Sequence, residues 1–430
     1  MKKLLGALLL LLPSSLAAQE RVQCDLISSR QFQSVGQGAV TYIGQPVFRC
    51  TNGSTISADS AVQVSSTGRA DFIGNVRFNE TDRALTSQYA QYSTRERRLM
   101  AQGNVLLKDN RDGSTLKAPA LDYFQKGGSN PQDKIEIYSG RPHAVLVRNR
   151  ANQPAAKDTT IVDADAMTLI GQQYFRGRGR VNVARGKLTT SSGFAEFAQD
   201  SNYMHLSDHA IVQSDTFKLS ADTIDADMVN GDQFKSVRAR KDARLNSHEA
   251  NIDAPRLTIS FDSGMVQRTV AVGGVRVLPN APQAKTSSKD FDLTADSIDA
   301  VSPRQKLDHV TAVGTATGKR LADSLDAKLP ELIARDWVKG DTVQAFFGAT
   351  KPDTAVVLQR LVANGAPAAS TYKFREKVNK DSTQLSVNYL TARHIDVSFK
   401  DGKVDQVRAE GDIRGMYLQP PKQEKKAAVK

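Results

Sequence analysis

The sequence predicts an all-β protein in which short strands repeat along an elongated sheet. Two observations predict this class. One short phrase recurs about every 30 residues, and its clearest copies are Phe72–Phe78 and Leu99–Leu107. The composition is 40% hydrophobic but only 6% aromatic, which favours a thin core over a large compact one. By length alone, 430 residues suggest two or three domains.

The repeat consists of two alternating phrases. The first is centred on a glycine or its substitute, and its anchors are Gly44, Gly74, Gly103, Gly179, Asp208, Lys241, Gly273, Gly314, Gly365 and Gly411. The second is an Ala-Asp phrase, found at Ala58-Asp59, Ala164-Asp165, Ala221-Asp222 and Ala295-Asp296. Each cycle therefore contains at least two elements.

The elements are predicted to be strands because apolar or small residues occupy every second position. This holds at 72, 74, 76 and 78, at 99 to 107, and at 175 to 183. The opposite face carries the arginines Arg176, Arg178, Arg180, Arg238, Arg240 and Arg244. One buried and one wet face is typical of antiparallel sheets. A glycine at the centre of the phrase indicates a bend or a close approach.

Turns and interruptions divide these strands. Turns are expected at Asn52-Gly53, Asp112-Gly113 and Asp401-Gly402. Loops are expected over 149–160 and 279–289, a short helix over 319–335, and a disordered basic tail over 420–430.

The N-terminus has the order of a secretory signal peptide. Two lysines precede an apolar run, Leu4–Leu12, and small residues follow up to Ala18. A retained membrane anchor is the alternative, but a bilayer-spanning helix needs about 20 apolar residues. We therefore expect residues 1–18 to be removed and the protein to reside in the periplasm.

Two cysteines, Cys24 and Cys50, follow this leader closely. In an oxidising compartment we expect them to form a disulfide, and two free thiols are the alternative. Two isolated cysteines lack the paired spacing of a zinc site.

The formal net charge of +12 favours an anionic partner such as nucleic acid, a membrane surface or a phosphorylated glycolipid. Export argues against nucleic acid. The exposed arginines fit two interpretations: they contact the phosphates of such a ligand, or they only keep the strands soluble.

No motif for catalysis is found, so the sequence predicts neither an enzyme nor a cofactor. His205 and His209 could share a strand face, but no third ligand accompanies them, and a surface strand is the simpler interpretation. The acids Asp163, Asp165, Asp222, Asp225 and Asp227 could suggest calcium or glycosidase chemistry. Their recurrence just before strands favours turn residues instead.

The alternation of Ala58-Asp59 with Gly74-Asn75-Val76 and Gly103-Asn104-Val105, behind a signal peptide, resembles the OstA/LptA family of lipopolysaccharide transport. Residues 397–411 are similar to the phrase that closes the repeats of that family. The resemblance covers about 40–418. It implies a β-jelly roll, open at its ends, whose interior takes the acyl chains of lipopolysaccharide and which joins other jelly-roll proteins in a periplasmic bridge.

A single unit of that family is shorter than this chain, so the resemblance implies two or three units in tandem, over 19–149, 158–278 and 290–418. The inward residues expected to bind lipid are Phe72, Val76, Phe78, Leu99, Val105, Leu107, Phe175, Val181 and Val183. Uncapped sheet edges near 40–48 and 406–417 predict head-to-tail self-association or docking of related proteins.

A different class of protein, a structural or adhesive β-solenoid without lipid cargo, is the alternative. Its rungs should recur at fixed spacing. Here the spacing varies from 29 to about 50 residues, which weakens this alternative. A carbohydrate-active β-helix enzyme would need a local cluster of acids and bases, and none stands out.

Overall fold

The fold is all-β, as predicted. A computed structural model describes residues 22–150, 153–171, 173–198, 200–229, 233–247, 250–279, 291–303, 306–320, 336–349, 356–379, 382–400 and 403–418. No α-helix occurs within these ranges. The chain divides into two compact units: unit 1 is Met1–Val147 with Ala166–Gln172, and unit 2 is Arg148–Asp165 with Gln173–Lys430. The expected segments 158–278 and 290–418 therefore fall mainly within one compact unit.

Unit 1 is an antiparallel sheet whose longest strands follow one another in the chain. Strands β6 to β10 pair in order, and β10 also pairs with β11 and β12. Its strands are β1 (Cys24–Ser28), β2 (Gln31–Val35), β3 (Val40–Gly44), β4 (Val47–Cys50), β5 (Thr55–Ser57), β6 (Ser60–Val64), β7 (Arg69–Asn79), β8 (Arg83–Ser93), β9 (Arg98–Asp109), β10 (Thr115–Phe124), β11 (Lys134–Ile137), the first part of β12 (His143–Arg150), and β14 (Ala166–Ile170).

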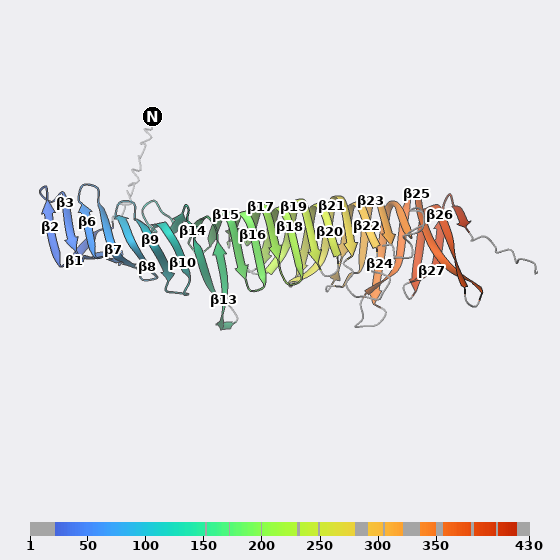
Figure 1. Ribbon diagram of the computed structural model, residues 1–430, viewed down its shortest axis with the longest axis horizontal. Coiled ribbons are helices and arrows are strands. Elements are labelled where there is room, and N and C mark those ends of the chain that lie inside the picture. Colours follow the sequence, from blue (N-terminus) through green and yellow to red (C-terminus); the bar gives the residue numbers. More distant parts are fainter. Residues whose placement is uncertain are drawn as a thin grey trace, which may run out of the picture. The chain divides into compact units, whose positions relative to one another are not determined.

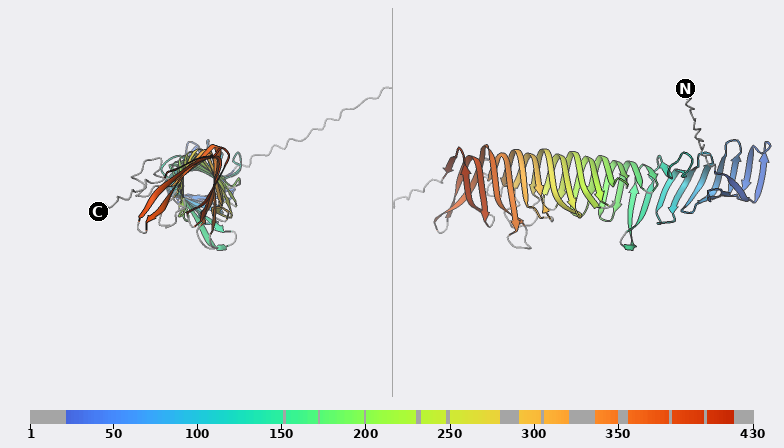
Figure 2. Two further views of the ribbon diagram at one scale, coloured as in Figure 1. Left: turned by 90° about the vertical axis from the view of Figure 1, so that its right-hand side faces the viewer. Right: turned by 180° about the vertical axis from the view of Figure 1, so that it is seen from behind.

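Unit 2 is an antiparallel succession in which every strand from β15 to β26 pairs with the next in the chain (Figure 1). Figure 2 shows the same order from behind. The strands are β13 (Gln153–Asp163), β15 (Tyr174–Arg185), β16 (Leu188–Ala198), β17 (Tyr203–Gln213), β18 (Phe217–Val229), β19 (Gln233–Ser247), β20 (Ala250–Asp262), β21 (Met265–Pro279), β22 (Phe291–Val301), β23 (His309–Arg320), β24 (Trp337–Ala349), β25 (Val356–Asn379), β26 (Ser382–Lys400), β27 (Lys403–Glu410) and β28 (Arg414–Leu418).

The anchors of the first phrase mark bends in the strands. At most of them two consecutive residues have a positive φ, and the pairing register shifts there. These pairs are Gly74-Asn75, Gly103-Asn104, Gly179-Arg180, Asp208-His209, Lys241-Asp242, Gly273-Gly274, Gly314-Thr315 and Gly411-Asp412. At each such bend, two residues of the bent strand lie opposite fewer residues of the partner strand, which is the geometry of a β-bulge. The glycine phrase therefore encodes a bend.

The Ala-Asp phrase faces the glycine phrase across this bend. The backbone N–H of Asp59 donates to the carbonyl of Gly74 at 2.9 Å, and Asn75 Nδ2 donates to Asp59 Oδ2 at 2.8 Å. Asp165 contacts Gly179 and Arg180 in the same way, with Arg180 Nη2 2.7 Å from Asp165 Oδ1. The two phrases alternate in the sequence because they form one contact in space.

Each bend divides its strand into two halves. In unit 1, half A comprises 76–79, 83–86, 105–108 and 115–118, and half B comprises 69–73, 89–93, 98–102 and 120–124. Aromatic rings from the two halves meet in the core. Phe78 of half A lies 6.3 Å from Tyr92 and 6.2 Å from Tyr123 of half B, measured between ring centroids. The two halves therefore face each other and enclose the core.

Three expectations about local structure need correction. The loop expected over 149–160 is instead the end of β12 and most of β13, with only 151–152 outside the described residues. Thr160, Ile161 and Val162 are β-branched and pair with β15. This pairing favours a strand in spite of the turn-like composition of the residues before them. The acids Asp222, Asp225 and Asp227 lie inside β18, not in a turn.

The third correction concerns the sheet edge in unit 1. β3 has β2 on one side and β6 on the other, and β4 lies between β1 and β5. The edge expected near 40–48 is therefore covered. The outermost strands are β1 and β2, which precede it in the chain. At the other end, β27 and β28 each pair only with β26 among the described residues.

Other expectations agree with the structure or lie outside it. Turns occur at Asn52-Gly53 and Asp112-Gly113, and Cys24 and Cys50 form a disulfide between paired positions of β1 and β4. Residues 1–18, 280–289, 321–335, 401–402 and 420–430 lie outside the described residues, so the leader, the second loop, most of the expected helix, the last turn and the tail are not described.

Candidate apolar ligand site

Rows of inward side chains run across unit 2 from strand to strand. The bends divide the strands of unit 2 into two halves, A and B, as in unit 1. In half B the pairing register aligns five buried residues, one from each of β17 to β21: Leu206, Ile224, Ala239, Leu257 and Ala271. Antiparallel pairing places such partners on one face of the sheet. The result is a continuous apolar row at right angles to the strands.

Half A carries its own inward rows. One row aligns Val183, Thr190, Val212 and Leu219 across β15 to β18. A second row, beside the bends, consists of small residues such as Ala210 and its partner Ala221. Small side chains suit a position where the strand turns sharply toward its other half.

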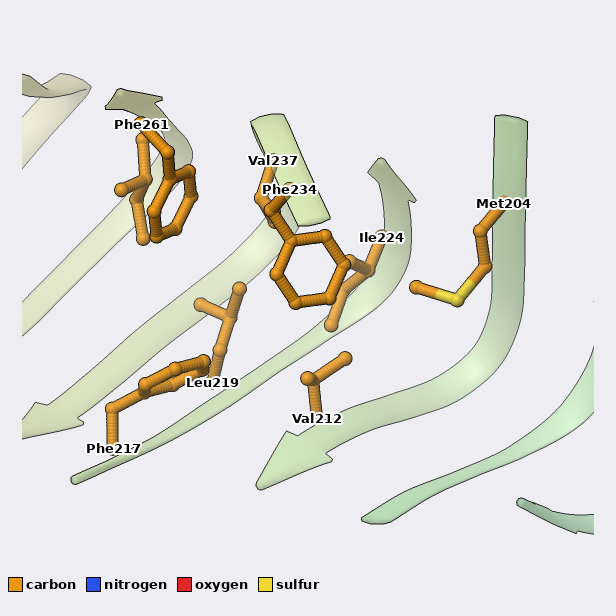
Figure 3. Close-up of a pocket in the computed structure, with 9 residues that line it drawn as sticks. Met204, Val212, Phe217, Leu219, Ile224, Phe234, Val237 and Phe261 are labelled. Carbon is orange, nitrogen blue, oxygen red and sulfur yellow. The ribbon is translucent and has the colours of Figure 1, made fainter. Parts of the chain in front are cut away.

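An apolar cavity lies where the ends of the two halves meet (Figure 3). Its lining comes from β17, β18, β19 and β20 and contains no charged side chain: Met204, Val212, Phe217, Leu219, Ile224, Phe234, Val237, Ile259 and Phe261. The cavity has a volume of about 10 Å³, enough for one water-sized group. We call the side of each unit opposite the bends, where the two halves meet, its seam.

The seam of unit 2 is partly open to solvent. Met204, Phe217, Phe234 and Phe261 are half-buried, and the rings of Phe234 and Phe261 lie 5.9 Å apart. Figure 3 shows these side chains converging from neighbouring strands. Half-exposed apolar groups around an apolar space favour an apolar ligand such as an alkyl chain, because contact removes them from water.

The residues expected to bind lipid lie in two places. Phe72, Val76, Phe78, Leu99, Val105 and Leu107 are buried in the core of unit 1. In unit 2, Phe175 and Val181 are buried and Val183 is half-buried. The structure therefore distributes the predicted set over the interiors of both units.

Sequence reasoning missed the seam residues Met204, Phe217, Phe234 and Phe261. A signal was present, because Phe217 continues the period-two pattern of Leu219 and Ala221 back to the turn at Asp215. The other aromatic residues also lie at strand ends. Extending the period-two pattern from each bend to the end of its strand would have identified them.

The outer face of unit 2 carries pairs of arginine and aspartate on neighbouring strands. Arg238 Nη1 lies 2.9 Å from Asp227 Oδ2, and Arg360 Nη2 lies 2.8 Å from Asp396 Oδ2. Arg360 holds the pKa of Asp396 below its usual range, although partial burial acts in the opposite direction. Cross-strand pairing thus offsets much of the positive charge that the sequence places on this face.

A metal site receives no support from the two predicted histidines. His209 and Asp208 occupy a bulge, which breaks the alternation that would align His209 with His205. His205 Nδ1 instead lies 2.7 Å from Asp225 Oδ1, and Arg240 contacts the other oxygen of that carboxylate. Across the described ranges, no three His, Cys, Asp or Glu side chains gather as metal ligands.

No protein-family model matches the chain, and no curated protein is significantly similar to it. In the part of the chain that the structure covers, no helix has the length and apolar character needed to cross a bilayer.

Proposed function

We propose that this protein binds the acyl chains of lipopolysaccharide, or of a related glycolipid, in the interior of unit 2 and passes the lipid across the periplasm toward the outer membrane. The proposal includes a jelly-roll architecture, as the resemblance to the OstA/LptA family implies. It assigns binding, and not catalysis, to the chain. The observation that carries it is the half-exposed apolar seam formed by Met204, Phe217, Phe234 and Phe261.

The energetics of the seam support an alkyl ligand. Each methylene removed from water contributes about 0.8 kcal/mol. Ten methylenes held along the seam would therefore contribute about 8 kcal/mol before the cost of ordering the chain. The rows extend from strand to strand, so one alkyl chain can contact several strands in succession.

Association through the outermost strands is part of the proposal. β2 and β28 are exposed along their whole length. Phe32 of β2 is 62% exposed, and Met416 of β28 is 58% exposed. An open strand edge with exposed apolar side chains favours addition of a strand from another chain. We propose a second copy or a related jelly-roll protein as the partner.

The alternative, a structural or adhesive β-solenoid, is less favoured. Such solenoids stack successive rungs in parallel. Every strand pairing described in unit 2 is antiparallel, and its strands bend at bulges. Those features support a folded, two-sided interior more than a column of flat rungs.

Photo-crosslinking in cells tests the lipid proposal. A photoreactive amino acid at Phe234 should capture lipopolysaccharide, because this side chain lines the seam cavity. The matched control is the same group at Val313, which is 45% exposed and lies next to Gly314 on another strand of unit 2. Equal capture at both positions, or none at Phe234 in correctly exported protein, would contradict the proposal.

A further inference from the structure

The seam of unit 1 differs from that of unit 2 because hydrogen bonds and an ion pair close it. Arg83, in half A, reaches across the core to half B. Its Nη1 donates to the hydroxyl of Tyr123 at 2.9 Å and to Asp133 Oδ2 at 2.8 Å. The guanidinium also lies over the ring of Tyr123, 5.3 Å from its centroid. One side chain thus joins β8 to β10 and to the residues before β11.

Glu80 makes the second connection between the halves. It lies in the turn after β7, next to half A, and accepts a hydrogen bond from the hydroxyl of Tyr123 at 2.7 Å. Gln125 also donates to Glu80 and accepts from Tyr92 at 2.8 Å. Tyr123 therefore bridges the carboxylate and the guanidinium, and these hydrogen bonds join residues 33 to 50 positions apart in the sequence.

We propose that Glu80, Arg83, Tyr123 and Asp133 form a latch that holds the two halves of unit 1 closed and excludes apolar ligands from its interior. The inner side chains of this unit are sealed from water, since Leu85 and Leu99 are 0% exposed. At the seam of unit 2 the corresponding side chains are apolar and half-buried. If the proposed function holds, lipid enters unit 2, while unit 1 stays closed until the latch opens.

The cost of burying these charges supports a role in specifying the closed state. Arg83 is only 8% exposed, and its Nε lies 4.0 Å from Asp109 Oδ2. Buried ion pairs are weak sources of stability compared with apolar side chains of the same size, and they are costly when one partner is lost. An apolar seam would hold a core at lower cost. A polar one opens and closes as a unit, because its contacts depend on each other.

Cysteine labelling of the full chain, without lipid, tests the latch independently of the proposed function. The native cysteines are disulfide-bonded, so a new cysteine is the only free thiol among the described residues. Leu85→Cys reports on the seam, because it lies on the same strand face as Arg83. Ala90→Cys, 0% exposed and near the bend, reports on the closed end of the core.

In the double variant Glu80→Gln with Arg83→Gln, native-state maleimide labelling of Leu85→Cys should accelerate by about tenfold or more, since hydrogen bonds to charged groups are lost. Labelling of Ala90→Cys should change much less, and thermal unfolding should remain cooperative. The control Lys134→Gln, which removes a cation from β11 that pairs with Glu136, should leave both rates unchanged.

If the double variant fails to fold, Tyr123→Phe provides the test, because it removes only the bridging hydroxyl. It should accelerate labelling of Leu85→Cys in the same direction. Unchanged labelling in a folded variant overturns the latch. Equal acceleration at both reporters also overturns it, since that pattern indicates general loosening of unit 1.

Discussion

Asp59 and Gly74 form the contact on which the repeat depends. Gly74 has a φ of 77°, and a Cβ built on it would lie 2.4 Å from Asp59 Oδ2. Gly74→Ala therefore combines a left-handed backbone with a steric conflict. We expect it to lower the free energy of unfolding by about 2 to 4 kcal/mol in urea denaturation. The matched control is Gly53→Ala, where φ is 85° but no atom lies within 4 Å of the added methyl group. Equal losses in both variants would show that the contact with Asp59 contributes nothing.

A charge at the seam of unit 2 should prevent lipid binding without unfolding the protein. Phe234 is half-buried, so Phe234→Asp leaves the carboxylate partly solvated in the free protein. A bound alkyl chain would cover that carboxylate, and burial of an unpaired charge is costly. We expect capture of lipopolysaccharide from a neighbouring crosslinking position to fall at least tenfold. Val313→Asp, on an exposed side chain, should have no such effect.

A carboxylate introduced into the core of unit 1 should affect folding instead of lipid binding. Val105 is 1% exposed in the closed core, so Val105→Asp buries a carboxylate with no partner. We expect a loss of several kcal/mol in the stability of unit 1, measured by urea unfolding. A folded Val105→Asp protein with native stability would mean that this core opens readily to water.

Glu80 should make the stability of unit 1 depend on pH. Burial raises its pKa above 4.5, although hydrogen bonds from Tyr123 and Gln125 oppose the shift. The folded form therefore binds the proton more tightly than the unfolded form does. The stabilisation is fully present below the pKa of the unfolded chain and is lost as pH rises through the folded-state pKa. As the pH is lowered from 7 to 4.5, the parent protein should gain stability relative to Glu80→Gln. A parallel pH dependence of the two proteins in urea unfolding would contradict this.

Removal of the disulfide should loosen the N-terminal edge. The bond closes a separation of 26 residues, and β4 is the strand with which β1 pairs. For a loop of this length, Cys24→Ser with Cys50→Ser should cost about 3 kcal/mol. Hydrogen exchange should then rise in β1 while β8 and β9 stay protected. Unchanged exchange in β1 would show that its pairing with β4 is sufficient.

The outermost strands should control association. Phe32→Asp places a charge on the exposed face of β2 and should weaken self-association, or association with a related partner, in light scattering across a range of concentrations. Ile73→Asp, 48% exposed on β7 between two neighbouring strands, is the matched control. Identical scattering of the two variants would argue against an interface at β2.

The strands and their bends follow from local sequence, and the closed seams do not. Alternation identified Phe72 and Val105 as inward, and the glycine anchors marked the bends, because both signals come from a few adjacent residues. Arg83 meets Tyr123 and Asp133 across 40 and 50 residues, and no local pattern encodes that meeting. The sheet edge of unit 1 was predicted at 40–48, in β3 and β4, although β1 and β2 are the outermost strands. Nothing in the local sequence shows that β1 pairs with β4 and β2 with β3.

The strictly sequential pairing in unit 2 has a consequence for how its length can evolve. Each strand from β16 to β26 is held by the strand before it and the strand after it in the chain. Stability in such arrays is close to a sum over neighbours, and folding can start anywhere and spread. Deleting β19 and β20 together would join β18 to β21 with the same strand directions. Duplication of one hairpin should therefore give a longer folded protein, and loss of one hairpin a shorter one. The length of unit 2 can thus change in steps of one hairpin.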